Sequence, residues 1–163
     1  MYRHILVPLD GSHLAEQVLP HVHTLAATEG TTQITLIRAI PPVITPAVDY
    51  SGIFVAANDP NALLDEEARA YLEGVATTFR NEGYVVHTVV TSMPAADAII
   101  DYAESEHADL IVIATHGRSG LSRWVFGSVT QKVVQVAPVP VLVIRPREVA
   151  NEQSHAAAHA ETA

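Results

Sequence analysis

The sequence predicts an α/β protein built on a doubly wound, five-stranded parallel sheet. Three observations indicate this class. Five apolar runs alternate with segments of helical periodicity, which is the pattern of successive βαβ units. The fourth run, ADLIVIAT at 108–115, is apolar almost throughout, as in strands buried on both faces. Turn-rich polar sequence follows the first and fourth runs, and doubly wound sheets bind ligands at such carboxyl ends.

Composition is consistent with one domain. The chain has 163 residues, of which 48% are hydrophobic, enough for a substantial core. The apolar runs are far shorter than the roughly 20 residues of a membrane span, and the N-terminus lacks the layout of a signal peptide. With no cysteine, neither a disulfide nor a thiolate ligand can form. We therefore expect a cytoplasmic protein that does not engage membranes.

The first strand is expected at 2–10, where YRHILVPLD is rich in β-branched and apolar residues. Ser12 is a suitable N-cap for the helix that follows. Pro20 lies inside that helix and is expected to kink it, because proline removes a backbone donor. The second strand is expected at 32–40, TQITLIRAI.

The middle of the chain begins with a long connection, 41–60, which has four prolines and no clear period. The next helix is expected to begin at Pro60, with Asp59 as its cap, and to end at Gly83. YVVHTVVT at 84–91 is the expected third strand.

Pro94 is expected to start the third helix, which leads to the fourth strand. A short helix then runs from about 128 to 137. Its valines Val129, Val133 and Val136 are expected to face inward.

The last strand is expected at 139–145, VPVLVIR, which completes a domain over 1–147. The remainder, 148–163, is polar and alanine-rich and is predicted to be a disordered tail. An apolar last strand without charge would aggregate if its edge stayed open, so pairing with a second copy is expected there. Coverage of that edge by the tail is the alternative.

Charge is unevenly distributed. The formal net charge is −9, which argues against nonspecific nucleic-acid binding. Residues 110–147 nevertheless contain five basic residues and no acidic one, so this segment is +5 and the remainder is −14. Either this is a solvated face, or it provides a positive field for an anionic ligand.

The loop after the fourth strand, within 114–129, is suited to phosphate. Gly117 and Gly120 allow backbone amides to approach a ligand closely. Gly127 and Ser128 precede a helix, whose free amides and dipole favour anions. A tight turn with a capped helix is the plainer interpretation of the same residues.

Arg118 and Arg123 are within the same loop and are candidates for contact with phosphate oxygens, although either is also compatible with a solvated position. His116 flanks the first of these glycines and is a further candidate. No spacing indicates a Ser-His-Asp set, and paired histidines elsewhere are poorly placed for a shared metal.

The segment ATHGRSGLSRWVFGS resembles the nucleotide-binding loop of the universal stress protein family, whose ATP-binding members show G-x2-G-x9-G-[ST]. Gly117 fills the second glycine position, nine residues follow, and Gly127-Ser128 closes the motif. The stretches ILVPLDGS, ADLIVIATHG and APVPVLVIR also resemble that family, so the likeness spans about 2–146. It implies a fold similar to flavodoxin and the adenine nucleotide alpha hydrolases, with strand order 3-2-1-4-5.

One position departs from the motif, since Ala114 stands where the first glycine is expected. If the backbone is extended there, the added methyl is tolerable; if positive φ is required, binding fails.

The resemblance further implies roles for individual residues. Asp10 would hold the ribose hydroxyls or the adenine edge, although capping of its own turn is the plainer role. Backbone groups at the end of strand two would meet adenine, and the glycine loop would cradle phosphates. The nucleotide-binding residues that the resemblance implies are Pro8, Leu9, Asp10, Ala39, Ile40, Ile113, Ala114, Gly117, Gly127, Ser128 and Val129. The chemistry of the loop adds His116, Arg118 and Gly120 as candidates.

These residues favour a binder over an enzyme. The loop offers no Walker lysine, and Asp10 is the only carboxylate expected at the crevice, so hydrolysis should be absent or very slow. We expect an adenine nucleotide (ATP, ADP or AMP) as ligand, with any Mg²⁺ carried by the nucleotide. The family resemblance implies a regulatory role in the stress response and a homodimer through Val139–Arg145. The alternatives are a nucleotide-free dimeric interaction module and a slow ATP hydrolase.

Overall fold

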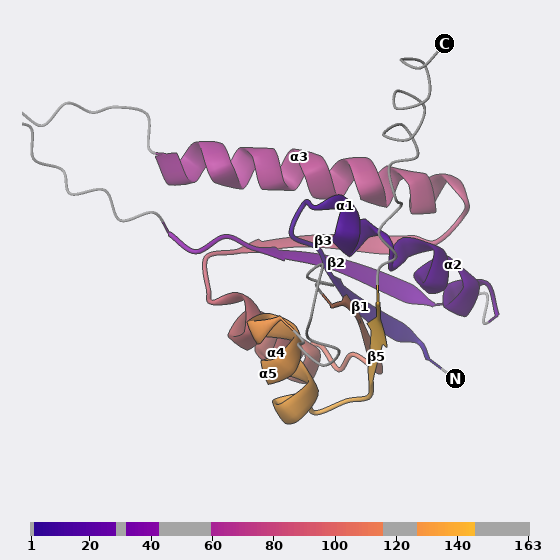
Figure 1. Ribbon diagram of the computed structural model, residues 1–163. Helices are drawn as coiled ribbons and strands as arrows, with labels where there is room; N and C mark the ends of the chain where they lie inside the picture. The colour runs from indigo at the N-terminus through magenta and orange to yellow at the C-terminus, as the bar shows by residue number, and fades with distance from the viewer. Residues whose placement is uncertain (1, 29–31, 43–59, 116–126, 146–163) are drawn as a thin grey trace, which may run out of the picture.

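The computed structural model describes residues 2–28, 32–42, 60–115 and 127–145. They form one five-stranded, all-parallel sheet in the order β3-β2-β1-β4-β5, which confirms the predicted fold class and strand order (Figure 1). The strands are β1 (His4–Pro8), β2 (Gln33–Ala39), β3 (Val85–Thr91), β4 (Leu110–Ala114) and β5 (Val141–Ile144).

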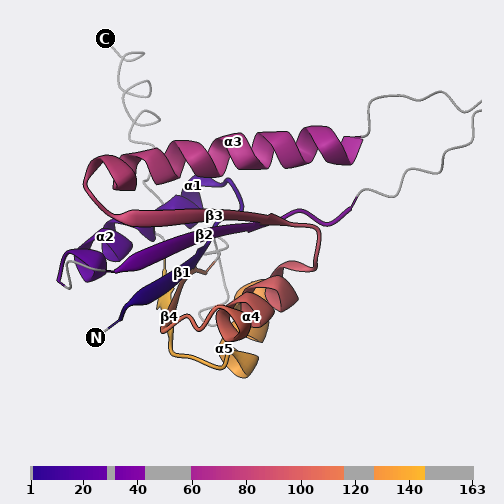
Figure 2. The same cartoon turned by 180° about the vertical axis from the view of Figure 1, so that it is seen from behind.

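Helices cover both faces of the sheet, giving three layers (Figures 1 and 2). One face carries α1 (His13–Glu16), α2 (Leu19–Ala27) and α3 (Pro60–Asn81), and the other carries α4 (Ala95–Ser105) and α5 (Ser128–Val136). Each face has its own apolar core, one around Leu72 of α3 and the other around Ile99 of α4. No described helix is both long and apolar enough to cross a bilayer.

The first predicted helix is interrupted rather than merely kinked. Ser12 caps α1 as expected, because its hydroxyl accepts the Ala15 amide at 3.1 Å. Pro20 then lies in the first turn of α2, where its missing N–H costs little. Between the two helices the Gln17 and Val18 amides bond three residues back, as in a tightened turn. Pro20 therefore starts a second helix.

The expectation that Val136 faces inward is wrong. Val133 is fully buried in the α4–α5 core, whereas the Val136 residue is 57% exposed at the end of α5. Val129 is partly buried against the same core. Val136 shares the helix face of Val129, since seven residues make about two turns, but it is the last residue of α5, so its place at the helix end, and not the helical phase, leaves it exposed.

The amino end of the sheet is tied together by polar groups. The Asp109 carboxylate accepts the amides of Arg3 and His4, at 2.9 and 3.0 Å. The buried His4 ring contacts Thr35 Oγ1 at 2.8 Å through Nε2 and the Glu106 carbonyl at 3.1 Å through Nδ1. These bonds hold the starts of β1, β2 and β4 in one plane.

The carboxyl ends of β1 and β4 separate instead. Their register is Ile5 with Leu110 and Leu6 with Ile111, after which no further pair is formed. The Leu9 amide bonds Ile37 of β2 at 2.9 Å. Backbone N–H groups alternate sides along a strand, so the backbone nitrogen of the preceding Pro8 is on the side of β4. Proline has no N–H to donate there. Pro8 thus ends the ladder and opens a crevice.

Several predicted features are outside the described residues. They are most of the 41–60 connection, including the Asp59 cap, most of the glycine loop, and the tail at 148–163. The α3 helix begins at Pro60 as expected, and Gly83 follows it with φ of +95°.

Two leucines of α3 test the assignment of its buried face. Leu72 is fully buried, whereas the Leu63 residue is 57% exposed. We expect Leu72→Ala to lower the free energy of unfolding by about 2–5 kcal/mol, because it removes buried methyl groups and leaves a cavity. Leu63→Ala should change it by less than about 0.5 kcal/mol. Urea unfolding of both variants measures this, and equal losses would contradict the packing.

Candidate functional site

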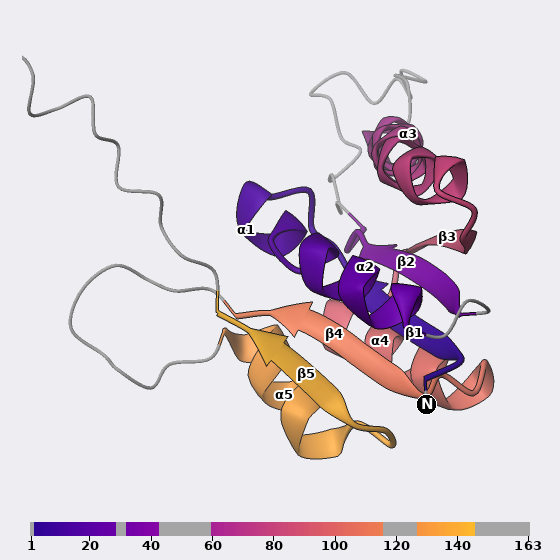
Figure 3. The same ribbon diagram turned by 90° about the vertical axis from the view of Figure 1, so that its right-hand side faces the viewer.

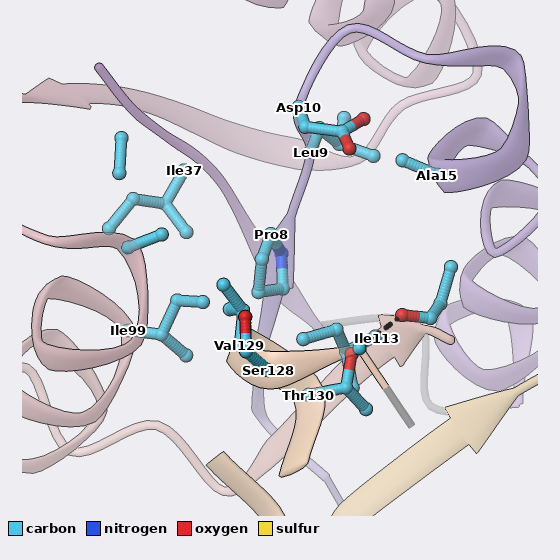
Figure 4. Close-up of a pocket in the computed structure, with 14 residues that line it drawn as sticks. Pro8, Leu9, Asp10, Ala15, Ile37, Ile99, Ile113, Ser128, Val129 and Thr130 are labelled. Carbon is cyan, nitrogen blue, oxygen red and sulfur yellow. Dashed lines mark hydrogen bonds between the residues drawn. The ribbon is translucent and has the colours of Figure 1, made fainter. Parts of the chain in front are cut away.

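A pocket of about 390 Å³ opens at the carboxyl edge of the sheet, between β1 and β4 (Figure 4). This is the place at which strand order reverses, as predicted. Most lining side chains are apolar, and the polar ones are few. The lining residues are Pro8, Leu9, Asp10, Ala15, Ile37, Ala39, Ala95, Ile99, Ile113, Ala114, Gly127, Ser128, Val129 and Thr130.

Asp10 stands at one rim of this pocket, in the turn between β1 and α1 (Figure 4). Its Oδ1 accepts the Ser12 amide at 2.8 Å, and Ser12 in turn caps α1. This is an Asx turn, so the turn-capping role anticipated for Asp10 is real. A carboxylate can accept several hydrogen bonds, so this turn is compatible with a further bond from a ligand hydroxyl.

Gly11 allows the turn to pack against an arginine. Its φ is +86°, and a Cβ there would lie 3.2 Å from Arg38 Nη1, so a side chain would be both strained and crowded. The Arg38 guanidinium also lies 5.3 Å from the centroid of the Tyr71 ring. The Tyr71 hydroxyl donates to Glu16 Oε1 at 3.0 Å. Burial, and then this bond, raise the pKa of Tyr71, so it stays a neutral donor.

Ala114 ends β4 in extended backbone, paired with Ile144 of β5. Among the described residues, His107 is the one non-glycine residue with positive φ. The strain that alanine would suffer at a positive-φ position is therefore absent at Ala114. Its methyl is one of the groups lining the pocket, and it is the smallest side chain that could replace the motif glycine.

The N-terminus of α5 forms the wall across from Asp10 (Figure 4). Gly127 is its N-cap, and no side chain caps the helix. The amides of Ser128, Val129 and Thr130 have no partner within the helix, because a first turn lacks preceding carbonyls. The exposed Ser128 hydroxyl adds a donor. This wall favours a bound anion.

The structure brings together nine of the predicted residues. Pro8, Leu9, Asp10, Ala39, Ile113, Ala114, Gly127, Ser128 and Val129 all line the pocket. Ile40 is not in the lining, and its amide donates to the Thr91 carbonyl at 2.8 Å. His116, Gly117, Arg118 and Gly120 lie outside the described residues, as does Arg123.

Five lining residues were missed by the sequence reasoning: Ala15, Ile37, Ala95, Ile99 and Thr130. Ile37 carried a signal, because it is two residues before Ala39 and so shares its face of β2. Ala95 and Ile99 come from α4, whose place against the pocket depends on the packed structure. Of the basic residues at 110–147, Lys132 pairs with Asp97 of α4 at 2.5 Å rather than serving the pocket.

Taken together, the pocket has two chemically different ends joined by an apolar middle. Ile37, Ile99 and Ile113 offer a flat ring only apolar contact. One rim supplies a carboxylate, which accepts from hydroxyls, and the other supplies amide donors and a helix dipole, which suit phosphate. The pocket therefore offers separate contacts for an apolar ring, for hydroxyl groups and for an anion.

Comparisons with known proteins agree with the motif. Residues 1–145 match the model of the universal stress protein family. Universal stress protein MJ0531 of Methanocaldococcus jannaschii is 30% identical over 145 residues, which cover 89% of this chain and 83% of that protein. Both chains are therefore aligned over most of their length.

Solved structures show the same fold. The structure of MJ0577, a universal stress protein of the same organism, superposes with a TM-score of 0.75 at 28% identity, covering 90% of this chain and 98% of that one. A universal stress protein in complex with cAMP has a TM-score of 0.61 at 19% identity, covering 88% and 96%.

The glycine motif, the strand order and the match over nearly the whole sheet thus point to one conclusion: this chain belongs to the universal stress protein family.

Proposed function

We propose that this protein binds an adenine nucleotide, ATP or a related phosphate ester, in the crevice between β1 and β4. The observation that carries the proposal is the uncapped N-terminus of α5 opening into this pocket. The apolar middle would hold the adenine ring, with the backbone of Ala39 beside it. Asp10 would accept from the ribose hydroxyls, and the amides from Gly127 to Val129, with the Ser128 hydroxyl, would bind phosphate.

The family supports this choice of ligand class. Apart from Ala114, the loop resembles the motif of the ATP-binding members of this family, and a universal stress protein of this fold was solved with cAMP. The preference among ATP, ADP, AMP and cAMP depends on the loop at 116–126, which lies outside the described residues. We therefore propose the adenine nucleotides as a class.

We propose a binder and regulator of the stress response rather than an enzyme. Asp10 is the one carboxylate among the described lining residues, and its turn already engages it. Within the described ranges, no three histidine or acidic side chains gather to hold a metal ion. Any Mg²⁺ would accordingly arrive with the nucleotide, bridging its phosphates. The nucleotide-free interaction module stays the rival proposal.

We further propose a homodimer through β5. This strand is at one end of the sheet, opposite β3, and its apolar residues Val141–Ile144 are only partly buried in the single chain (Figure 3). Nearby on α5, Val134 and Val136 are exposed. A second copy would cover both the open strand edge and these valines.

Nucleotide titration tests the site directly. We expect ATP to bind with micromolar affinity, about −8 kcal/mol, in isothermal titration. Ser128→Ala should weaken ATP about tenfold, since it removes one charge-assisted hydrogen bond. Ser105→Ala is the matched control, because its hydroxyl donates to the Tyr102 carbonyl at the end of α4, outside the pocket. Absence of binding by ATP, AMP and cAMP alike would favour the interaction module.

Single-turnover measurements test the absence of catalysis. With protein in excess over radiolabelled Mg·ATP, we expect hydrolysis far below about 1 s⁻¹, because Asp10, the one carboxylate among the described lining residues, is at the rim proposed for ribose and away from the phosphate end. A rate near that value would overturn the assignment as a binder.

Sedimentation velocity tests the assembly. At micromolar concentration the protein should sediment with twice the mass of the chain, because an open apolar edge is buried by pairing. A clean monomer over that range would rule the dimer out.

A further inference from the structure

The buried hydroxyl of Thr130 joins the two ends of the glycine loop. Thr130 Oγ1 donates to the Ala114 carbonyl at 3.0 Å, which spans sixteen positions of the chain (Figure 4). The Thr130 residue is 3% exposed and lies in the first turn of α5. Ala114 is the last residue of β4. The loop that leaves β4 and enters α5 therefore starts and ends at this bond.

Neighbouring bonds make both ends of this link rigid. On the β4 side, the Thr115 amide donates to the Ile144 carbonyl at 2.9 Å. On the α5 side, the Gln131 amide donates to the Gly127 carbonyl at 2.9 Å. β4 and α5 also share an apolar core, but the Thr130 bond is a directional polar link between them, and it helps to set where the first amides of α5 point relative to β4.

Thr130 is poorly suited to contact a phosphate itself. A hydroxyl has one proton, and that of Thr130 is given to Ala114, so toward the pocket it presents only lone pairs. Lone pairs repel a phosphate oxygen, whereas the Ser128 hydroxyl and the backbone amides attract it. Any effect of Thr130 on a nucleotide must then pass through the backbone that it holds.

From this geometry we propose that Thr130 is a positioning residue that holds the phosphate-binding end of the pocket in its binding conformation. The inference rests on the proposed nucleotide site. It assigns the hydroxyl a selective effect: phosphate affinity depends on it, whereas contacts with the adenine and ribose do not, since those groups meet β1, β2 and α4.

Thr130→Val tests this, because valine has nearly the same shape and no hydroxyl. The matched control is Thr32→Val. The Thr32 residue is 2% exposed, and its hydroxyl likewise donates to a backbone carbonyl, that of Tyr2, at 3.1 Å. Thr32 precedes β2 at the amino end of the sheet, away from the pocket. Thr130→Ser keeps the hydroxyl. If the Thr130→Val protein does not fold, Thr130→Ala removes the hydroxyl without adding a methyl group in its place.

Two measurements are made on each variant. Isothermal titration should show ATP binding weakened about tenfold in Thr130→Val, because the misplaced α5 amides lose about one hydrogen bond to phosphate. Adenosine has no phosphate, so its affinity should stay within about twofold of the parent value. Thr32→Val should bind both like the parent, and Thr130→Ser should recover most of the ATP affinity. Amide hydrogen exchange without ligand should be severalfold faster at Thr115 and Gln131 in Thr130→Val than in Thr32→Val.

The outcomes separate the two proposals. ATP affinity unchanged in Thr130→Val, or adenosine weakened as much as ATP, overturns the positioning role. If the parent protein binds neither ATP nor adenosine, the nucleotide proposal fails. Hydrogen exchange alone then tests whether Thr130 holds α5 against β4. In that case, equal exchange at Thr115 and Gln131 in the two valine variants overturns the link itself.

Discussion

The site depends on one interrupted strand pairing. β1 and β4 are held together at their amino ends, where the Asp109 carboxylate accepts the amides that start β1. They part toward their carboxyl ends because Pro8, which faces β4, has no N–H. A continued ladder would have brought Pro8 and Ile113 into contact across the sheet. The missing donor instead leaves room for a ligand between two otherwise regular strands.

The two sides of the crevice differ in polarity: one carries a hydrogen-bond acceptor and the other carries donors. The β1 side turns sharply at Gly11, which places Asp10 at the rim, and the Arg38 guanidinium packs under that turn. The β4 side returns as α5, whose first amides have no acceptor within the helix and carry the positive end of its dipole. Acceptor and donor ends thus arise from turn chemistry and helix geometry. Few charged side chains are needed, which suits an acidic protein.

The sequence determined most of this arrangement and left some of it open. The alternation of apolar runs was sufficient to predict the sheet. The glycine spacing predicted the pocket wall at Ser128, and the family resemblance predicted the wall at Asp10. Ala114 was ambiguous because its tolerance depends on φ, which the neighbouring strand decides. Ile99 and Thr130 were missed because helix packing, rather than local spacing, brings them to the pocket. Val136 was misjudged because periodicity gives the face of a helix but not how far along the helix the packed core extends.

The two edges of the sheet differ in a way that favours assembly through only one of them. At β3, Arg80 of α3 donates to the Val86 carbonyl from Nε and Nη2, at 3.1 and 2.8 Å, so this edge acceptor is already used. Glu73 holds Arg80 in place and also accepts from Thr88, and these bonds lower the pKa of Glu73. A charged network of this kind discourages pairing with another strand. β5 has an apolar, half-buried face instead, so the homodimer proposed above would form at this edge, with the α5 helices of both copies near the interface.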